Sequence, residues 1–353
     1  MRQETSRGNW HPENYSRIQE ALGRLAVGEA DTGAGPLCAV FDFDNTCIFR
    51  DIGQAVFRVQ LLDLHYRISP DTLAQLIPSQ GEAMAGRPWH LLRSTILTKY
   101  QELWPLVQAG KKEAAKASPA YQPFVTLFYW LVANARSTPT LGPRYVLSLL
   151  AKLQAGYSLQ ELHGLCVRIL EQVQQEPLAA KTLQAQLPEP LGTVSTSYPT
   201  GLTPFAEMQA LMRLFQSHGL RCFVVSASSE WLVKTVAPLL GFPLASADIF
   251  GVRTKMGPGE AVLPEDAVDY PLTYREGKNE IIDRFISARP WFVAGDADTD
   301  YDMLTRPGVS IRLLINRNLS GLIAELYDRP DILLQGIDQS SGSFRPSSET
   351  LSP

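Results

Sequence analysis

Short apolar runs that end in polar or acidic residues recur along the chain and are separated by stretches with helical spacing. These runs occupy residues 37–41, 222–225, 291–294 and 310–315. They are continuous rather than alternating, which is typical of strands buried on both faces of a parallel sheet. Helical patterns over residues 207–219 and 278–286 lie between them. The alternation predicts an α/β fold with a doubly wound parallel sheet.

The segment from residue 51 to 195 has a different pattern, which is helical almost throughout. Helices are predicted over residues 54–67, 89–109, 122–136 and 144–154. Ser158 followed by Glu161 is a capping-box signature for a further helix. That helix would place Leu162, Cys166, Ile169 and Val173 on one face. We therefore expect a helical cap domain inserted between the first and second core strands.

These patterns divide the chain into four parts. Residues 1–36 form a polar lead-in with one helix over 13–25 and a Gly/Ala-rich linker from Ala30 to Pro36. The α/β core comprises residues 37–50 and 196–336, and the helical cap comprises residues 51–195. The Ser/Pro-rich tail, residues 337–353, is expected to be disordered.

Composition narrows the class of protein. The chain has 353 residues, of which 45% are hydrophobic and 19% charged, as in ordinary globular proteins. A net charge of -4 without a basic cluster argues against a nucleic-acid partner. No apolar stretch approaches ~18 residues, so no membrane span is expected. The N-terminus lacks the apolar segment of a signal peptide, so we expect a cytoplasmic location.

The cysteines indicate no metal site. Cys38, Cys47, Cys166 and Cys222 show neither CxxC spacing nor histidine partners at zinc-site distance. Cys38 and Cys222 border apolar runs, as buried free thiols commonly do. A reducing compartment fits this pattern best.

Two acids, Asp42 and Asp44, directly follow the first predicted strand. Ligands of an open parallel sheet bind beyond the carboxyl ends of its strands. Two carboxylates there repel each other unless a cation or a shared proton compensates. One acid can then be an ionised nucleophile and metal ligand, and the other a general acid that later acts as a base.

A second group of acids follows the third of these apolar runs, after Gly295. Its members are Asp296, Asp298, Asp300 and Asp302. Carboxylate oxygens suit Mg²⁺, which usually takes one or two protein carboxylates together with water and phosphate oxygens. The alternation also resembles a calcium loop, but the glycine and the distant glutamate of an EF-hand are missing, so we do not expect calcium.

Two further elements complete a candidate phosphoryl site. Ser226-Ala227-Ser228 follows a strand, where a hydroxyl and backbone N–H groups can hold phosphate oxygens. Lys278 begins a predicted helix and could balance phosphate charge and orient the nucleophile. Each element alone also fits a turn, a helix cap or a solvated side chain. Their occurrence in order, mostly after apolar strands, favours a shared site.

This pattern resembles the haloacid dehalogenase superfamily of aspartate-nucleophile phosphatases. The stretch from Asp42 to Thr46 matches the first motif of that family, DxDx[TV], and Ser226 matches the second. Lys278 matches the third motif, and Gly295-Asp296 with Asp300 matches the fourth. The match covers residues 37–50 and 200–318. A helical cap between the first two motifs is the arrangement of the phosphoserine-phosphatase-like branch.

The resemblance implies catalytic roles for matched residues. Asp42 would be phosphorylated, and Asp44 would protonate the leaving oxygen and later activate water. Ser226 and the Ala227 amide would bind the transferring phosphoryl group, and Lys278 would neutralise it.

The resemblance also implies a magnesium site. Asp42 and Asp296 would bind Mg²⁺, the backbone carbonyl of Asp44 would complete the protein ligands, and Asp300 would support them. An acid at the position of Asp44 distinguishes the phosphatases from the dehalogenases of the family.

Several segments are similar to bacterial phosphorylcholine phosphatases. They are residues 9–12, 41–46 followed by 50–53, 201–203 before 207–208, and 225–228. Those enzymes bind a trimethylammonium group, for which the cap offers a possible aromatic cage. The candidate residues are Trp89, Trp104, Tyr129 and Trp130. Packing in the helix core is the alternative interpretation of these rings. Those phosphatases are typically exported, whereas no leader is visible here.

The function expected from the sequence is a Mg²⁺-dependent phosphomonoesterase acting on a small phosphorylated metabolite, with phosphocholine or a related phospho-amino alcohol as candidate substrate. A phosphoserine phosphatase or a phosphotransferase would use the same chemistry. A non-catalytic phosphometabolite-binding protein is disfavoured because every chemical position is filled. The sequence does not predict the oligomeric state.

Overall fold

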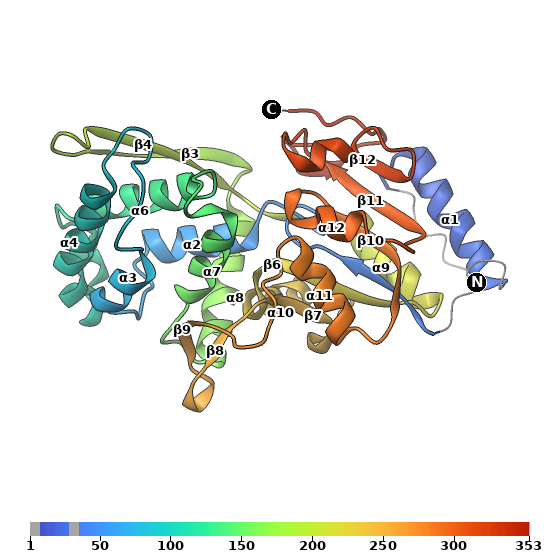
Figure 1. The fold of residues 1–353 in the computed structure, drawn as a ribbon, viewed down its shortest axis with the longest axis horizontal. Helices are drawn as coiled ribbons and strands as arrows, with labels where there is room; N and C mark the ends of the chain where they lie inside the picture. Colours follow the sequence, from blue (N-terminus) through green and yellow to red (C-terminus); the bar gives the residue numbers. More distant parts are fainter. Residues whose placement is uncertain (1–7, 28–34, 353) are drawn as a thin grey trace. The chain divides into compact units, whose positions relative to one another are not determined.

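The computed structural model describes residues 8–27 and 35–352, and the chain divides into two compact units (Figure 1). The core unit comprises Met1–Ile52, Gly201–Val252 and Pro271–Pro353. The helical unit comprises Gly53–Thr200 and Arg253–Tyr270. The chain therefore enters the helical unit twice.

The core unit is built on a seven-stranded sheet with the order β13-β12-β11-β10-β1-β6-β7. Its strands are β1 (Leu37–Phe41), β6 (Arg221–Ser229), β7 (Ile249–Val252), β10 (Arg289–Gly295), β11 (Ile311–Asn316), β12 (Ile332–Asp338) and β13 (Ser343–Phe344). Every neighbouring pair is parallel except β12 with β13. The predicted α/β fold with a mainly parallel sheet is confirmed. The hydrophobic pattern missed β7 and β12.

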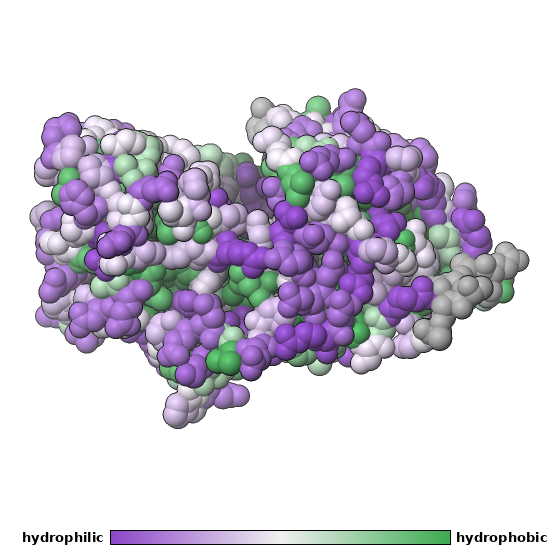
Figure 2. Space-filling view, viewed as in Figure 1, coloured by the Kyte–Doolittle hydropathy of each residue, from purple (hydrophilic) through white to green (hydrophobic). Residues whose placement is uncertain are grey.

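Helices and short strands complete the core unit. They are α1 (Pro12–Ala26), α9 (Ala206–Ser217), α10 (Glu230–Leu239), α11 (Glu276–Phe285), α12 (Tyr301–Leu304), β2 (Ile48–Phe49) and β5 (Thr203–Pro204), with 3₁₀ turns at Ser246–Asp248, Asp298–Asp300 and Leu322–Leu326. The predicted helix over 13–25 is confirmed as α1, which begins at a proline and buries Ile18 and Leu22 one turn apart. The linker predicted from Ala30 to Pro36 lies mostly outside the described residues. Hydrophilic residues gather over α11 and α12 in Figure 2.

The C-terminal segment differs from its prediction as a disordered tail. β13 pairs with β12, and the Leu351 N–H donates to the Ile337 carbonyl at 2.9 Å. Phe344 is 2% exposed, with its ring centroid 5.0 Å from that of Trp10 and 4.7 Å from that of Phe205. Strand pairing and aromatic packing therefore order this segment despite its Ser/Pro-rich composition, and the prediction was wrong for residues up to 352.

The helical unit contains the predicted helices and two short ones that were not predicted, Pro70–Leu76 and Lys112–Lys116. They are α2 (Ile52–Leu62), which starts at the last residue of a core segment, α3 (Pro70–Leu76), α4 (Trp89–Gln108), α5 (Lys112–Lys116), α6 (Tyr121–Ala135), α7 (Gly142–Lys152) and α8 (Leu159–Gln175). The capping box of α8 is present: the Glu161 N–H donates to Ser158 Oγ, and the Ser158 N–H donates to Glu161 Oε2. The predicted apolar face of α8 is buried. Among the described residues, no helix is long and apolar enough to cross a membrane.

A β-hairpin in the helical unit departs from the helical prediction. β3 (Ala179–Gln186) and β4 (Thr193–Thr200) pair antiparallel along their full length. The Ala, Lys, Leu and Gln residues of β3 favour helix in isolation. Leu183 and Ala185 are nevertheless buried two residues apart, which is strand spacing. Packing in this unit has overridden the local propensity.

A second hairpin belongs to the helical unit although the sequence placed it in the core. It contains β8 (Thr254–Met256), a 3₁₀ turn (Pro258–Glu260) and β9 (Val262–Asp266). The Val262 N–H donates to the Tyr157 carbonyl at 2.8 Å, and Gly156 N–H donates to the Val262 carbonyl at 2.9 Å. Lys152 also forms an ion pair with Asp266 at 2.7 Å. These long-range contacts explain the departure, because no local pattern encodes them.

Candidate active site

The carboxyl ends of β1, β6 and β10 bring the predicted site residues together. Asp42 follows β1, and its backbone N–H donates to the Ala294 carbonyl of β10 at 2.9 Å. Asp296 directly follows β10, while Ser226 and Ser228 lie near the end of β6. β1 lies between β10 and β6 in the sheet. Parallel pairing therefore places these side chains at one edge, where α/β proteins bind ligands.

Lys278 is the cation within this group. Its Nζ donates to Asp42 Oδ1 at 2.6 Å and to Asp300 Oδ1 at 2.5 Å, and its side chain is fully buried. It lies in the first turn of α11. Burial acts to lower the Lys278 pKa, but the Asp300 and Asp42 carboxylates outweigh it and raise that pKa. The amine therefore keeps its charge and neutralises part of the buried negative charge.

Backbone amides and a glycine fix Asp300. Its Oδ2 accepts the N–H groups of Asp296 at 3.0 Å and Ala297 at 3.2 Å. A side chain at Gly295 would place its Cβ 2.5 Å from the Cβ of Asp300, closer than such atoms approach. Glycine is thus required at the end of β10 to let Asp300 pack against the strand.

Three buried carboxylates form a cluster with the spacing of metal ligands. Asp42, Asp296 and Asp300 each offer an oxygen, and these oxygens lie within 4.8 Å of one another. The hydroxyl of Thr46 connects two of them, at 3.2 Å from Asp42 Oδ2 and 3.4 Å from Asp296 Oδ1. The side chain of Asp44 is not a member of this cluster, so only its backbone carbonyl remains as the predicted metal ligand.

Burial and mutual repulsion oppose ionisation of this cluster. The pKa of Asp42 is raised by burial and by the neighbouring Asp300 charge, while Lys278 acts to lower it. Burial raises the pKa of Asp296 to about 6, although Arg317 opposes the shift through an ion pair. A bound divalent cation would compensate both charges. The donor set, made of hard oxygen atoms, fits Mg²⁺.

Asp44 has a separate set of partners. Its Oδ1 accepts the Ile52 N–H at 2.7 Å, and its Oδ2 accepts the Ser228 hydroxyl at 2.7 Å. Ser226 Oγ lies farther away, at 3.4 Å from the same Oδ2. Burial and the nearby Asp51 charge raise the pKa of Asp44 to about 8, against the effect of these hydrogen bonds. The raised pKa favours the protonated form of Asp44 over the ionised one near neutral pH.

The loop after Asp44 is held in a strained conformation. Asn45 and Arg50 adopt left-handed backbone angles, with φ of 58° and 80°. The Asn45 N–H donates to the Arg50 carbonyl at 3.1 Å, and the Arg50 N–H donates to Asn45 Oδ1 at 3.2 Å. Such angles are unfavourable for residues with a Cβ and persist where the surroundings impose them. The closed loop restricts the positions of both catalytic candidates.

Several contacts could not be assigned from sequence. Arg317, which forms an ion pair with Asp296, lies inside the matched range but is not a motif residue, and nothing in its sequence neighbourhood marks it. The Ile52 amide is a backbone group, so no residue type in the sequence could indicate its hydrogen bond to Asp44. Ser228 was noted beside Ser226, but its contact with Asp44 was not foreseen. The amide of Ala227, which lies between these serines in the chain, stays a predicted phosphoryl donor.

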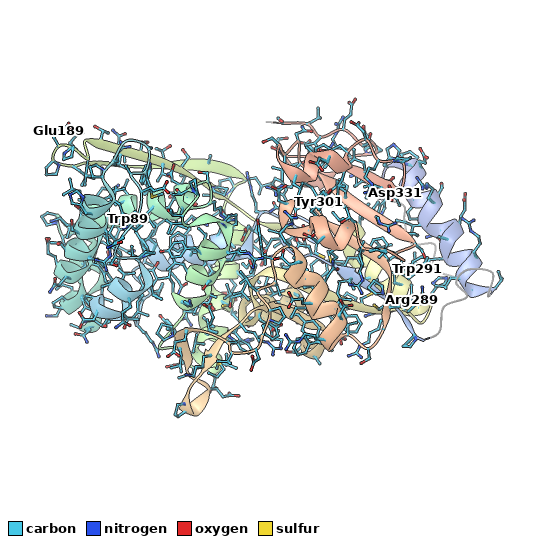
Figure 3. All side chains as sticks on the ribbon, viewed as in Figure 1. Trp89, Glu189, Arg289, Trp291, Tyr301 and Asp331 are labelled. Atoms are coloured by element: carbon cyan, nitrogen blue, oxygen red, sulfur yellow. The ribbon has the colours of Figure 1, made fainter. Side chains whose placement is uncertain are left out.

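The four aromatic candidates for a cation cage lie in the hydrophobic core of the helical unit. Trp89, Tyr129 and Trp130 are buried there, and Trp104 is partly buried against it. Trp89 lies at the start of α4 (Figure 3). Its Nε1 donates to the Pro78 carbonyl at 3.0 Å. Tyr129 stacks on Phe57 with ring centroids 5.6 Å apart. This placement favours helix-core packing for these rings, and the cage stays a prediction.

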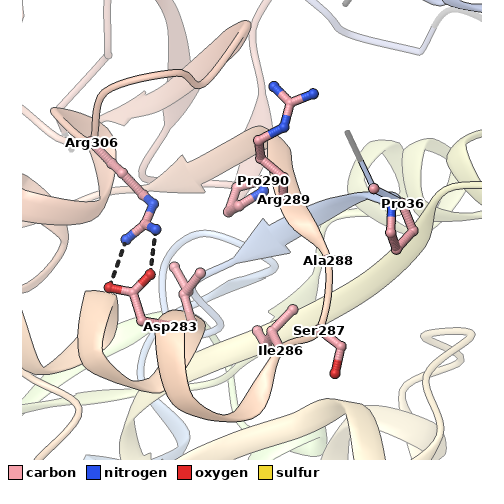
Figure 4. Close-up of a pocket in the computed structure, with 10 residues that line it drawn as sticks. Pro36, Asp283, Ile286, Ser287, Ala288, Arg289, Pro290 and Arg306 are labelled. Carbon is pink, nitrogen blue, oxygen red and sulfur yellow. Dashed lines mark hydrogen bonds and ion pairs between the residues drawn. The ribbon is translucent and has the colours of Figure 1, made fainter. Parts of the chain in front are cut away.

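A cavity of about 250 Å³ opens at the other end of the sheet (Figure 4). It is lined by Pro36, which precedes β1, by Arg289 and Pro290 at the start of β10, and by Asp283 and Arg306, which form an ion pair. Pro36, Arg289 and Pro290 mark the amino ends of β1 and β10. The carboxylate cluster lies at their carboxyl ends, so the cavity is not part of the candidate active site.

Comparison with known proteins supports the fold and assigns no function. No family model matches the chain, and no curated protein matches it. A conserved functionally unknown protein from Anaerococcus prevotii DSM 20548 has a similar structure, with a TM-score of 0.85 and 23% identity over 99% of this chain and 98% of that one. At this identity the likeness shows the fold alone.

Two more distant structures are hydrolase-like by name. One is a phosphoserine phosphohydrolase-like protein from Francisella tularensis, with a TM-score of 0.38 and 12% identity over 79% of this chain and 86% of that one. The other is a HAD family hydrolase from Salmonella enterica, with a TM-score of 0.38 and 11% identity over 89% and 80%. Likenesses this low support no inference about the site. The fold and the carboxylate cluster define an α/β protein with a candidate metal-binding site at the carboxyl ends of its strands.

Proposed function

We propose that this protein is a Mg²⁺-dependent phosphomonoesterase of the haloacid dehalogenase type, with Asp42 as its nucleophile. The observation that carries the proposal is the carboxylate cluster itself. The Asp42 carboxylate is buried, and its Oδ1 lies 2.6 Å from Lys278 Nζ. Carboxylate oxygens of Asp42, Asp296 and Asp300 lie within 4.8 Å of one another. The order of the sequence motifs supports the same assignment. A purely structural role would not explain so many acids buried at one sheet edge.

In the first half-reaction, a carboxylate oxygen of Asp42 attacks the phosphorus atom, and the bond from phosphorus to the alcohol oxygen breaks. Asp44 gives its proton to that leaving oxygen. The Ser226 hydroxyl and the Ala227 amide bind phosphoryl oxygens, and Lys278 offsets their charge. The products are the free alcohol, an aspartyl phosphate on Asp42 and an ionised Asp44.

In the second half-reaction, ionised Asp44 takes a proton from water as the water oxygen attacks phosphorus. The bond from Asp42 to phosphorus breaks and inorganic phosphate leaves. Asp44 is then protonated again and the cycle closes. Its pKa of about 8 suits a group that donates and accepts a proton near neutral pH.

Mg²⁺ would be held by Asp42, Asp296 and the backbone carbonyl of Asp44, and it would neutralise charge on the phosphoryl oxygens. Asp300 supports this site rather than binding directly, because its oxygens already accept from Lys278 and from two amides.

Removal of divalent cations with EDTA is expected to lower phosphate release by more than about 100-fold, and added Mg²⁺ should restore it. Mg²⁺ should also raise the thermal unfolding midpoint, because it binds the folded cluster and relieves repulsion there. The midpoint shift is measured without substrate and should vanish in Asp296→Asn. Full turnover after exhaustive chelation would contradict the proposed metal site.

We propose a small phosphorylated metabolite as substrate, with phosphocholine or a related phospho-amino alcohol as the first candidate. This part rests on the sequence similarity to phosphorylcholine phosphatases. The runner-up is phosphoserine. A phosphotransferase with the same intermediate differs only in the acceptor that is admitted. We further propose a cytoplasmic setting, since all four cysteines are free and buried thiols.

A phosphate-release screen tests the function. It should include phosphocholine, phosphoethanolamine, phosphoserine, glycerol phosphates and sugar phosphates, each with and without added alcohol acceptors. Inorganic phosphate formed with water as sole acceptor supports the hydrolase, and phosphorylated acceptor supports the transferase. A ranking led by phosphoserine would replace phosphocholine as the substrate. No turnover of any member, together with binding of one, would support the non-catalytic alternative.

A further inference from the structure

The two carboxyl oxygens of Asp44 face different kinds of partner. Oδ1 lies 2.7 Å from the Ile52 backbone nitrogen, which can only donate a hydrogen bond. A proton on Oδ1 would clash with that N–H, so Oδ1 stays an acceptor throughout. Oδ2 lies 2.7 Å from the Ser228 hydroxyl. A backbone amide therefore holds one oxygen of Asp44, and a side-chain hydroxyl holds the other.

We propose that Ser228 is a positioning residue, which fixes the direction of the Asp44 carboxyl group through its 2.7 Å contact with Oδ2. A hydroxyl group can donate a hydrogen bond to this carboxyl oxygen and leave the opposite side of the carboxyl group open to the leaving oxygen. One contact can thus keep the same carboxyl orientation throughout the reaction. The inference rests on the proposed function, because it assigns Asp44 the acid and base steps.

The turn that carries Ser228 is itself tightly fixed. The Ser228 N–H donates to Ser226 Oγ at 3.0 Å. The fully buried Glu230, two residues on, accepts the Gly251 N–H of β7 at 3.2 Å. A Cβ on Gly251 would lie 2.6 Å from the Ser228 carbonyl oxygen, so β7 passes directly against this turn. A fixed donor can orient a carboxyl group, whereas a mobile one cannot.

Ser226 is not equivalent to Ser228 in this respect. Its Oγ lies 3.4 Å from Asp44 Oδ2, a long contact, and already accepts the Ser228 N–H. In the proposed reaction its O–H turns to the phosphoryl group. Ser228 is left as the hydroxyl dedicated to Asp44. In this proposal Ser226 binds the phosphoryl group and Ser228 orients Asp44.

The test compares leaving groups in Ser228→Ala. Alkyl phosphates such as phosphocholine have poor leaving groups that need a proton, whereas p-nitrophenolate leaves without one. The kcat/KM value reports steps up to phosphorylation of Asp42 when that step is irreversible. We expect Ser228→Ala to lower kcat/KM for the alkyl ester turned over best by about 10–100-fold. For p-nitrophenyl phosphate the loss should stay below about threefold.

Three further variants sharpen the result. Asp44→Asn should show the same leaving-group dependence with a larger loss, of about 10²–10⁴ for the alkyl ester. Ser228→Thr keeps the hydroxyl and should recover most of the activity. Thr235→Val removes a buried hydroxyl that donates to the Trp231 carbonyl inside α10, and should leave both substrates unaffected.

The outcomes separate this proposal from the proposed function. Equal losses for both esters in Ser228→Ala, or no loss for either, would overturn the positioning role while Asp44 and Asp42 keep theirs. Equal losses without rescue by Ser228→Thr would indicate a disturbed turn instead. If the wild-type protein hydrolyses neither an alkyl nor an aryl phosphate, the proposed function fails first, and the role of Ser228 falls with it.

Discussion

Asp42→Asn is expected to abolish phosphate release, with a loss of at least about 10⁴-fold in kcat, while the protein stays folded. An amide cannot form the aspartyl phosphate, so the reaction loses its covalent route rather than one hydrogen bond. The measurement is phosphate release under saturating substrate and Mg²⁺. Mass spectrometry of acid-quenched wild-type protein should also show one added phosphoryl group, which the variant lacks.

The contacts of Asp42 explain why the fold should survive. The Asn oxygen can still accept from Lys278 Nζ, which now lies 2.6 Å from Asp42 Oδ1. The Asn amide can donate to Thr46 Oγ1, whose hydroxyl is then free to donate to Asp296, 3.4 Å away. Removing one buried charge also relieves the repulsion that raises the Asp42 pKa. The unfolding midpoint should therefore not fall.

A matched control is Asp302→Asn. Asp302 lies close in sequence to the acidic cluster but forms a partly exposed ion pair with Arg275 instead. Its removal should change turnover by less than about threefold, because such pairs contribute little. If Asp42→Asn kept more than a trace of activity, or if phosphoenzyme still formed in it, the nucleophile would have to be another residue.

The sequence predicted those parts of the fold and site that depend on local residue patterns. Buried parallel strands are continuous apolar runs, so β1, β6, β10 and β11 could be located to within a few residues. Because parallel strands share a carboxyl edge, the acids and serines after them could be expected to converge. The structure does bring Asp42, Asp44 and Asp296 to one edge.

The rest depends on contacts between distant residues. Strand β3 is built largely from helix-forming residues, and its pairing with β4 makes it a strand. Residues 253–270 join the helical unit through backbone hydrogen bonds to residues about a hundred positions earlier. Arg317 likewise reaches Asp296 from a loop after β11. No local periodicity predicts such pairings.

Lys278→Met is expected to destabilise the core unit by about 3–5 kcal/mol at neutral pH and to remove activity. Lys278 is fully buried between Asp42 and Asp300, at 2.6 and 2.5 Å. Breaking a buried ion pair by removing one partner leaves an uncompensated charge in a medium that cannot solvate it. Methionine fills a similar volume, so a cavity adds little to the loss. The measurement is urea unfolding without Mg²⁺, with hydrogen exchange of β1 and β10 to report on this unit.

A matched lysine separates the charge effect from the substitution itself. Lys255 pairs with Glu265 at 3.0 Å, with both side chains about half exposed. Lys255→Met should change stability by less than about 1 kcal/mol, because water already solvates that pair. Equal effects of the two substitutions would mean that the buried triad contributes no more than a surface ion pair.

The pH dependence of the stability of Lys278→Met tests independently whether unpaired charge causes the loss. In Lys278→Met the pKa of Asp42, already raised by burial and by Asp300, loses the cation that lowers it. A carboxyl group whose folded pKa exceeds its unfolded value binds more protons when folded, so stability rises as pH falls. The deficit of Lys278→Met relative to wild type should therefore shrink as pH is lowered toward the ordinary carboxyl pKa of ~4. A deficit that stayed constant with pH would show that lost packing, rather than unpaired charge, destabilises the variant.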